Sequence, residues 1–139
     1  MILCAIQNTM QNYIFEIQLK VRDYECDIQG IVNNAVYQNY LEHARHEYLH
    51  SKNISFKQLT ADGIVLMVSR IEMDFKRSLT SGDTFAVKLR IERQGAKLIF
   101  FEDIFNVSDG ALYLKAKVDV IAKINDKLSR GEIFDTLNL

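Results

Sequence analysis

The chain has 139 residues, of which 48% are hydrophobic and 25% charged, a composition typical of one ordinary globular domain. Six glycines and no proline exclude collagen-like and low-complexity chains, because this apolar content supports a packed core. A formal net charge of -1, from 17 basic and 18 acidic side chains, gives no general attraction to nucleic acid or to an anionic membrane.

The N-terminal residues show no targeting or membrane pattern. Residues 1–5 are apolar, but no basic residue precedes them, and Gln7 and Asn8 interrupt the run at once. A signal peptide needs about 7–15 apolar residues and a membrane helix about 20. We expect residues 1–12 to be a disordered extension, residues 13–139 to form a single domain, and no membrane insertion. Two cysteines are too few for a disulfide framework and favour the reducing cytoplasm.

The first predicted elements are a strand and a long helix. Residues 15–22 alternate between apolar and polar side chains, which predicts a strand with one buried face. The alternation stops over residues 23–33, which are predicted to form a loop. A helical period then begins, which predicts a helix capped by Asn33 or Asn34 and ending near Lys52. Its apolar stripe consists of Tyr37, Leu41, Ala44 and Tyr48.

The rest of the chain is predicted to form strands after one short helical turn at residues 55–61. Apolar or alternating runs predict four strands, at residues 64–76, 85–92, 98–107 and 111–123. The turns between the last strands are short, so these strands are antiparallel neighbours. The fold class is therefore α+β, with a five-stranded antiparallel sheet and one long helix. Since one helix covers only part of such a sheet, we expect a homodimer.

The most suggestive chemistry lies where the loop meets the long helix. Asp27 precedes Gly30 and the helix start at Asn34. A helix N-terminus leaves unpaired N–H groups that can hold an oxyanion. A nearby carboxylate can act as nucleophile or general base. Because an acid before a helix is more often a plain cap or turn residue, the pattern alone leaves a structural and a catalytic role open.

A longer motif surrounds this loop. Its residues are Asp27, Gly30, Val32, Asn33, Asn34, Tyr37, Tyr40, Glu42, Ala44 and Arg45. The motif resembles the signature of the hotdog-fold acyl-CoA thioesterases of the 4-hydroxybenzoyl-CoA thioesterase family, and the likeness extends from about Phe15 to Lys123. The resemblance implies a hotdog fold, in which the five-stranded sheet wraps around the helix. It also implies a thioester hydrolase that releases a free acid and CoA or acyl carrier protein, with no further cofactor.

The resemblance also implies roles for matching residues. Asp27 would be the catalytic carboxylate, the backbone N–H of Asn34 would polarise the thioester carbonyl, and Gly30 would let the loop approach the acyl group. Substrate contacts are implied for Asn33, Tyr37, Arg77, Arg93 and Lys97. Ile31 and Ser78 differ from the residues that are common at their positions in the family. Where relatives often carry a basic pair, this chain has only Lys97. These departures leave the acyl group and the CoA contacts unassigned.

Two other patterns compete for a functional role. His43, His46 and His50 share one helix face at spacings that suit a metal. That face lies opposite the apolar stripe, so we expect exposed histidines and no metal site. Cys26 adjoins Asp27, but no histidine is placed in sequence to activate its thiol.

Two alternatives to hydrolysis remain open. One is a hotdog module that binds an acyl thioester without cleaving it, and the other is a hotdog dehydratase, which typically uses a catalytic histidine.

For the hydrolase, the active site should lie between two copies of the chain. Asp27 and the Asn34 N–H would come from one copy, and pocket walls and phosphate contacts from the other. We expect a homodimer that assembles into a dimer of dimers.

Overall fold

The computed structural model describes residues 12–139, so most of the expected N-terminal extension lies outside the described residues. In chain order the elements are β1 (Phe15–Lys20), the short 3-10 helix η1 (Asp23–Glu25), α2 (Asn34–Ser51), α3 (Phe56–Ala61), β2 (Ile64–Phe75), β3 (Thr84–Gln94), β4 (Lys97–Asn106), β5 (Leu112–Ile124), β6 (Lys127–Leu128) and α4 (Glu132–Thr136). Each predicted strand and helix is present. Elements β6 and α4 were not predicted, because they are too short to show a periodic pattern.

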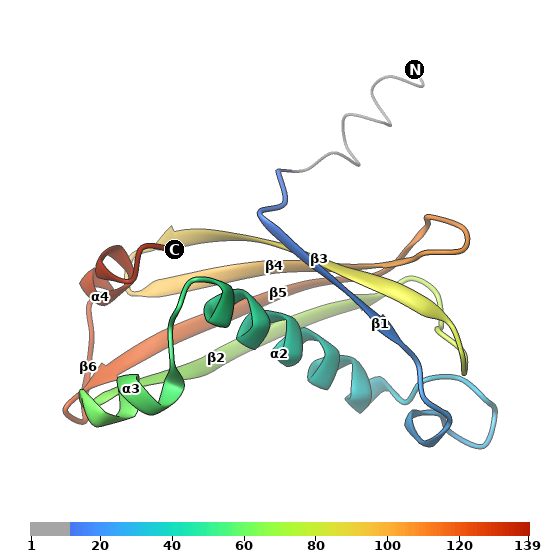
Figure 1. Cartoon of the computed structure of the whole chain (residues 1–139), viewed down its shortest axis with the longest axis horizontal. Helices are drawn as coiled ribbons and strands as arrows, with labels where there is room; N and C mark the ends of the chain where they lie inside the picture. Colours follow the sequence, from blue (N-terminus) through green and yellow to red (C-terminus); the bar gives the residue numbers. More distant parts are fainter. Residues whose placement is uncertain (1–11) are drawn as a thin grey trace.

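The strands form one antiparallel sheet in the order β1-β3-β4-β5-β2, and the short β6 pairs with the end of β5. The sheet is curled, and α2 lies along its concave face (Figure 1). The α+β prediction is therefore confirmed: one long helix packs inside five antiparallel strands. The hotdog arrangement implied by the resemblance is the one observed.

Helix α2 buries the predicted stripe against the sheet. Asn33 is the N-cap, and its side chain accepts a hydrogen bond from the Ala35 N–H at 3.0 Å. The buried residues of the helix are Tyr37, Tyr40, Leu41, Ala44, Arg45, Tyr48 and Leu49. The buried face is wider than the four-residue stripe because the curled sheet reaches around the helix. No helix within residues 12–139 is long and apolar enough to cross a membrane.

The core lies between α2 and the concave face of the central strands. Phe85 and Leu89 of β3, Phe100 and Ile104 of β4, and Leu114 of β5 are almost fully buried there. Each such side chain contributes roughly 1.5–3 kcal/mol on transfer from water.

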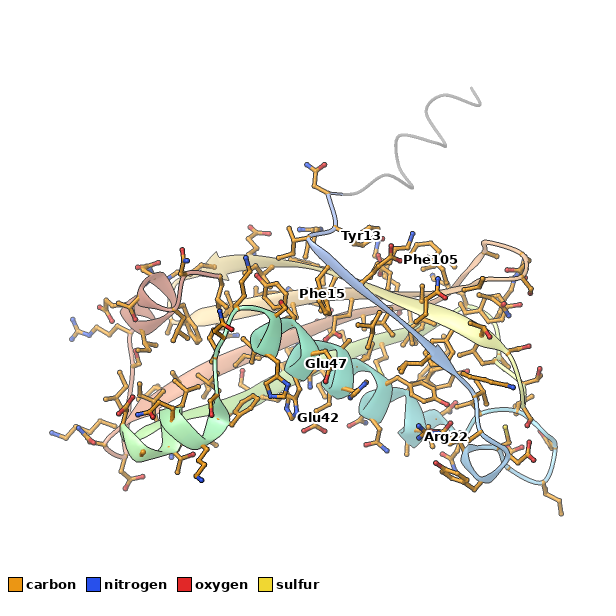
Figure 2. The ribbon with its side chains drawn as sticks, viewed as in Figure 1. Tyr13, Phe15, Arg22, Glu42, Glu47 and Phe105 are labelled. Carbon is orange, nitrogen blue, oxygen red and sulfur yellow. The ribbon has the colours of Figure 1, made fainter. Side chains whose placement is uncertain are left out.

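The convex face of the sheet carries polar and aromatic side chains. There Tyr13 lies edge-on to Phe105, with ring centroids 6.2 Å apart, and donates a hydrogen bond to Asp103 at 2.5 Å (Figure 2).

The edge strand β2 is the exception to this burial. Four of its apolar side chains are between 39% and 48% exposed: Val65, Met67, Val68 and Phe75. A long edge strand with exposed apolar side chains is a template for pairing with another strand. Edge strand β2 therefore has the exposed apolar character that suits pairing with another strand.

Candidate active site

The loop before α2 folds back on itself in a tight turn. Cys26 and Val32 form an antiparallel bridge, and the Asp27 N–H donates to the Ile31 carbonyl at 2.9 Å. Gly30 closes the turn by donating to the Asp27 carbonyl at 2.9 Å. Its φ of +80° favours glycine, and a Cβ there would meet nothing within 4 Å. The turn thus leaves open space around Gly30, beside Asp27.

The Asp27 carboxylate is exposed at this turn. Its Oδ1 accepts hydrogen bonds from the Gln29 N–H at 2.9 Å and the Ile31 N–H at 3.4 Å, an Asx turn that fixes the side chain. Its Oδ2 has no hydrogen-bond partner among residues 12–139. Asp27 therefore stabilises the turn through Oδ1, and its fixed side chain leaves Oδ2 open to a ligand.

The first turn of α2 leaves a free donor. The Asn33 side chain accepts from Ala35, and the Asn33 carbonyl accepts from the Val36 N–H at 2.9 Å. The exposed N–H of Asn34 has no partner in the described part of the chain. It lies at the positive end of the helix dipole, where a developing negative charge is stabilised. Of the two capping residues left open by the sequence, Asn33 is the cap and Asn34 carries the free N–H.

The loop is anchored on one side to the segment after β2. The Val32 N–H donates to the Leu79 carbonyl at 2.9 Å, and Ile31 bridges Thr80. The Leu79 N–H donates to the Tyr37 hydroxyl at 3.0 Å. Tyr37 is only 2% exposed, and this hydrogen bond supplies the partner that a buried phenol hydroxyl needs. Within the described chain Tyr37 supports the loop through this hydrogen bond, and the substrate contact implied for it stays a prediction.

On its other side the loop is tied to α2 by a carboxylate. The Tyr40 hydroxyl donates to Glu25 Oε1 at 3.0 Å, and the same oxygen accepts from the Arg22 N–H at 2.8 Å. Burial, together with this hydrogen bond to Glu25, raises the pKa of Tyr40. The hydroxyl therefore stays protonated and keeps the loop in place. This contact was not predicted, since Glu25 and Tyr40 are separated by fifteen positions in the sequence.

Cys26 is not arranged as a nucleophile. Burial and the nearby carboxylates, Asp23 first and then Asp27, raise the pKa of its thiol. A raised pKa leaves little thiolate, the reactive form, at neutral pH. The interpretation of Cys26 as a loop side chain is therefore favoured.

The basic residues assigned to substrate binding are divided between the two ends of the sheet. Arg77 follows β2 near the Asp27 loop, but its guanidinium lies 6.0 Å from the Tyr113 ring and 3.8 Å from Asp109. Arg93 and Lys97 flank the β3–β4 turn at the opposite end. Arg93 pairs with an α4 carboxylate and Lys97 with a β5 carboxylate, namely Asp135 and Asp119. One chain alone does not bring Arg93 and Lys97 to Asp27.

The histidines do not form a metal centre. No group of three His, Cys, Asp or Glu side chains within residues 12–139 has a geometry that could hold an ion. His43 and His50 are exposed, as predicted. His46 differs, because its ring packs against Phe56 with centroids 4.6 Å apart. This contact arises because Phe56, the first residue of α3, lies beside the C-terminal half of α2.

An ion pair is buried beneath the middle of α2. Arg45 Nη1 lies 2.8 Å from Oε1 of Glu102 on β4, and the Glu102 side chain is fully buried. Its Oε2 has no partner in the described structure. Burial raises the pKa of Glu102 to about 8, although Arg45 opposes the shift. This pair was not predicted, because Arg45 and Glu102 are far apart in the sequence. It lies farther along α2 than the Asp27 loop, which is at the start of the helix.

The chain is similar to known thioesterases. The sequence profile of the thioesterase superfamily matches residues 29–111, more than half of the chain. The chain is 46% identical over 103 residues to the chloroplastic acyl-acyl carrier protein thioesterase ATL3 of Arabidopsis thaliana. That match covers 73% of this chain and 54% of the relative. The chain therefore spans about half the length of this curated relative.

Solved structures share the fold. A 1,4-dihydroxy-2-naphthoyl-CoA thioesterase from Synechocystis superposes with a TM-score of 0.81 at 18% identity, covering 88% of this chain and 93% of the other. A mutant of 4-hydroxybenzoyl-CoA thioesterase in complex with 4-hydroxybenzoyl-CoA superposes with a TM-score of 0.74 at 18% identity, covering 83% and 89%. At this identity the likeness shows the hotdog fold alone.

Proposed function

This chain belongs to the thioesterase superfamily, and we propose that it is an enzyme that hydrolyses an acyl thioester to a free acid and a thiol. The observation that carries the proposal is the pairing of an open Asp27 carboxylate oxygen with the unpartnered Asn34 N–H at the start of α2. The thiol would be CoA or an acyl carrier protein, the carriers that the names of its relatives print. Asp27 and Asn34 suffice for the steps below without a metal or further cofactor.

The reaction would proceed by acyl transfer at the thioester carbonyl. The Asn34 N–H donates to the carbonyl oxygen and stabilises the oxyanion of the tetrahedral intermediate. Asp27 either attacks the carbonyl carbon or takes the proton of an attacking water. Collapse of the intermediate breaks the C–S bond, and the sulfur leaves as a thiolate that takes a proton from solvent or from the protonated Asp27. In the nucleophilic route the acyl group stays on Asp27 as an anhydride, until water attacks it, releases the free acid and restores the carboxylate. The open space around Gly30 lets the acyl group approach this loop.

The complete site would form between two copies of the chain. We propose that the exposed β2 edges pair antiparallel around a two-fold axis. Helix α2 runs opposite to β2, because Tyr37 packs on Phe75 while Leu49 shares a cavity with Leu66. The two-fold axis would therefore place the N-terminus of one α2 beside the C-terminal half of the other.

This pairing also gives a role to the distant basic residues. Arg93 and Lys97 of one copy would lie at the same end of the joined sheets as Asp27 of the second copy. They are then candidates to contact the phosphates of the carrier. The homodimer, its assembly into a dimer of dimers, and the cytoplasmic location suggested by the two cysteines are all part of the proposal.

The test is a thiol-release assay on the intact chain. Substrates would be straight-chain acyl-CoAs, benzoyl-CoA and the matching acyl carrier proteins, with wild type compared with Asp27→Asn. We expect the variant to lose roughly 10²–10⁴-fold in kcat, the range for a positioned acid or base. Its thermal midpoint should be unchanged, since the amide retains an oxygen for the Asx turn.

The matched control is Asp23→Asn, the same charge change in the same loop at a side chain that contacts Ser81. It should keep wild-type turnover. If wild type binds acyl thioesters but releases no thiol, the chain is the non-catalytic binding module instead. Unchanged turnover in Asp27→Asn would remove Asp27 from the mechanism.

A further inference from the structure

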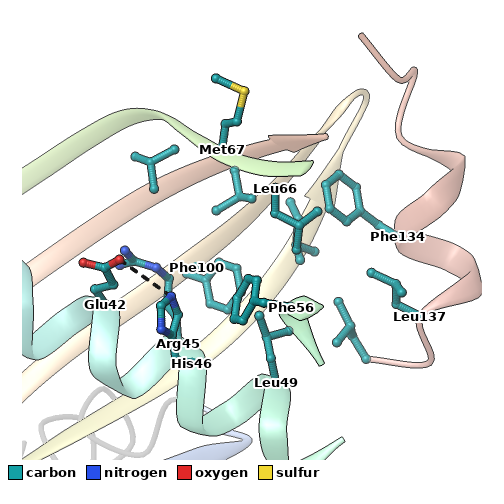
Figure 3. Close-up of a pocket in the computed structure, with 14 residues that line it drawn as sticks. Glu42, Arg45, His46, Leu49, Phe56, Leu66, Met67, Phe100, Phe134 and Leu137 are labelled. Carbon is teal, nitrogen blue, oxygen red and sulfur yellow. Dashed lines mark ion pairs between the residues drawn. The ribbon is translucent and has the colours of Figure 1, made fainter. Parts of the chain in front are cut away.

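A partly enclosed hollow lies beside the C-terminal half of α2, away from the Asp27 loop of the same chain (Figure 3). Its volume is about 200 Å³, and α2, α3, β2, β4, β5 and α4 all contribute to its walls. Most lining side chains are apolar, among them Leu49, Phe56, Leu66, Phe100 and Phe134. Such a cavity suits a hydrocarbon group more than a polar one.

The two ends of this cavity differ in character. Glu42, Arg45 and His46 line one end, and Phe134 and Leu137 of the α4 region line the other (Figure 3). The Arg45 Nη1 is taken up by Glu102, and the remaining N–H groups of the guanidinium have no partner among residues 12–139. A ligand with a polar end and an apolar tail therefore fits in one direction, with its tail toward α4.

The wall made by α4 is fixed in place. Gly131, just before the helix, has a φ of +102°, and a Cβ there would lie 2.4 Å from the Gly95 carbonyl oxygen. The backbone thus packs directly on the β3–β4 turn, where only glycine fits. An ion pair between Arg93 and Asp135 joins the same two parts. Phe134 is consequently held with only 5% of its surface exposed.

The other side of the cavity reaches the β2 edge. Met67 and Val68 line it, and they are 39% and 43% exposed. Within one chain, Arg45 lies roughly 16 Å along α2 from Asn34 at 1.5 Å per residue, too far for a short acyl group. In the antiparallel pairing proposed above, the Asp27 loop of a second copy would lie beside this edge instead.

We propose that this cavity receives the tail of the acyl chain and that Phe134 is the specificity-determining residue that limits its length. The inference rests on the proposed function, in which the thioester carbonyl is held by Asp27 and Asn34 of the second copy. The tail then enters past the polar end of the cavity and stops against the Phe134 ring. A single methylene in an apolar pocket changes selectivity by roughly 10–200-fold, so the size of this side chain should decide which chain is preferred.

The test varies the side chain in both directions. The wild type, Phe134→Leu and Phe134→Trp are assayed for kcat/KM on straight-chain acyl-CoAs, in steps of two carbons from butanoyl to hexadecanoyl. We expect the preferred chain to lengthen in Phe134→Leu and to shorten in Phe134→Trp. The ratio of kcat/KM between neighbouring chains should change by roughly tenfold or more. Opposite shifts from a smaller and a larger side chain are not expected of a residue that only stabilises the fold.

The matched control is Leu128→Ala on β6, an apolar side chain that is 60% exposed and outside the cavity. It should keep the wild-type chain profile. Thermal midpoints show that each variant is folded. An unchanged profile in both Phe134 variants, shifts in the same direction, or loss of turnover on every chain would overturn the inference while wild-type activity stands. No thiol release by wild type on any substrate would instead count against the proposed function.

Discussion

The two ends of α2 are built in different ways. At its N-terminus, residues 26–34 form a polar turn in which Oδ2 of Asp27 and the N–H of Asn34 have no partner within residues 12–139. At its C-terminal half, side chains from six elements enclose an apolar cavity. The first end supplies groups that can react with a thioester. The second end supplies an apolar cavity whose shape can select among acyl groups. In the proposed enzyme, chemistry and selectivity would therefore be separable, since the segments that provide them share only the helix.

The ends also differ in what stabilises them. The Asp27 loop is held by backbone hydrogen bonds to Leu79 and by the hydroxyls of Tyr37 and Tyr40. The middle of α2, at the start of the cavity, is held over the sheet by the buried pair of Arg45 and Glu102. Loss of the exposed Asp27 carboxylate should therefore lower turnover without changing the free energy of unfolding. Loss of the buried Arg45–Glu102 pair should lower the free energy of unfolding.

The strongest test of this contrast is Arg45→Leu. Removing the guanidinium leaves Glu102 buried without its partner, which costs about 3–5 kcal/mol when the carboxylate is charged. The free energy of unfolding, measured with urea at several pH values, should fall by about that amount at alkaline pH. The fall should be smaller in acid, where Glu102 takes up a proton.

A double variant, Arg45→Leu with Glu102→Leu, serves as the control for that measurement. Replacing both partners by apolar groups removes the unpaired charge and should recover much of the lost stability. Equal stability of wild type and Arg45→Leu across the pH range would show that the pair does not stabilise α2 on the sheet.

A smaller effect is expected from Glu102→Gln. The pKa of Glu102 is raised from 4.5 to about 8 by burial, so between these values the folded chain holds a proton that the unfolded chain has lost. The protonated Glu102 therefore makes its full contribution to the free energy of unfolding below pH 4.5. This contribution is lost as the pH rises through 8. Glutamine keeps an acceptor for Arg45 but does not titrate. The pH-dependent loss of unfolding free energy should be about 1–3 kcal/mol smaller in the variant, and parallel curves for the two proteins would contradict the assignment.

The smallest effects separate the two asparagines at the start of α2. Asn33→Ala removes the N-cap and should lower the free energy of unfolding by about 1 kcal/mol. Asn34→Ala should change stability by less than about 0.5 kcal/mol, as for an ordinary exposed position. Turnover should also be nearly unchanged in Asn34→Ala, because its proposed donor is the backbone N–H. A large loss of turnover there would mean that the side chain acts directly.

The sequence predicted most of the architecture because the relevant patterns are local. Alternating residues marked the five long strands, and the change of period at Asn34 marked α2. The loop chemistry was also visible, since Asp27, Gly30 and Asn34 lie within eight positions of one another. The short turns also predicted that the last strands are antiparallel neighbours, whereas the pairing of β1 with β3 and of β2 with β5 was not predicted.

The tertiary structure decided what depends on contacts between distant residues. It made Asn33 the cap, buried Tyr37 against the loop segment at Leu79, and packed His46 on Phe56. It also joined Arg45 to Glu102 and closed the cavity with α4, a helix too short to leave a pattern in the sequence. Hydrophobic periodicity reports which face of an element is buried, but not which partner buries it. The residues proposed to react could therefore be predicted from the sequence. The cavity proposed to select the acyl group forms only when the protein folds.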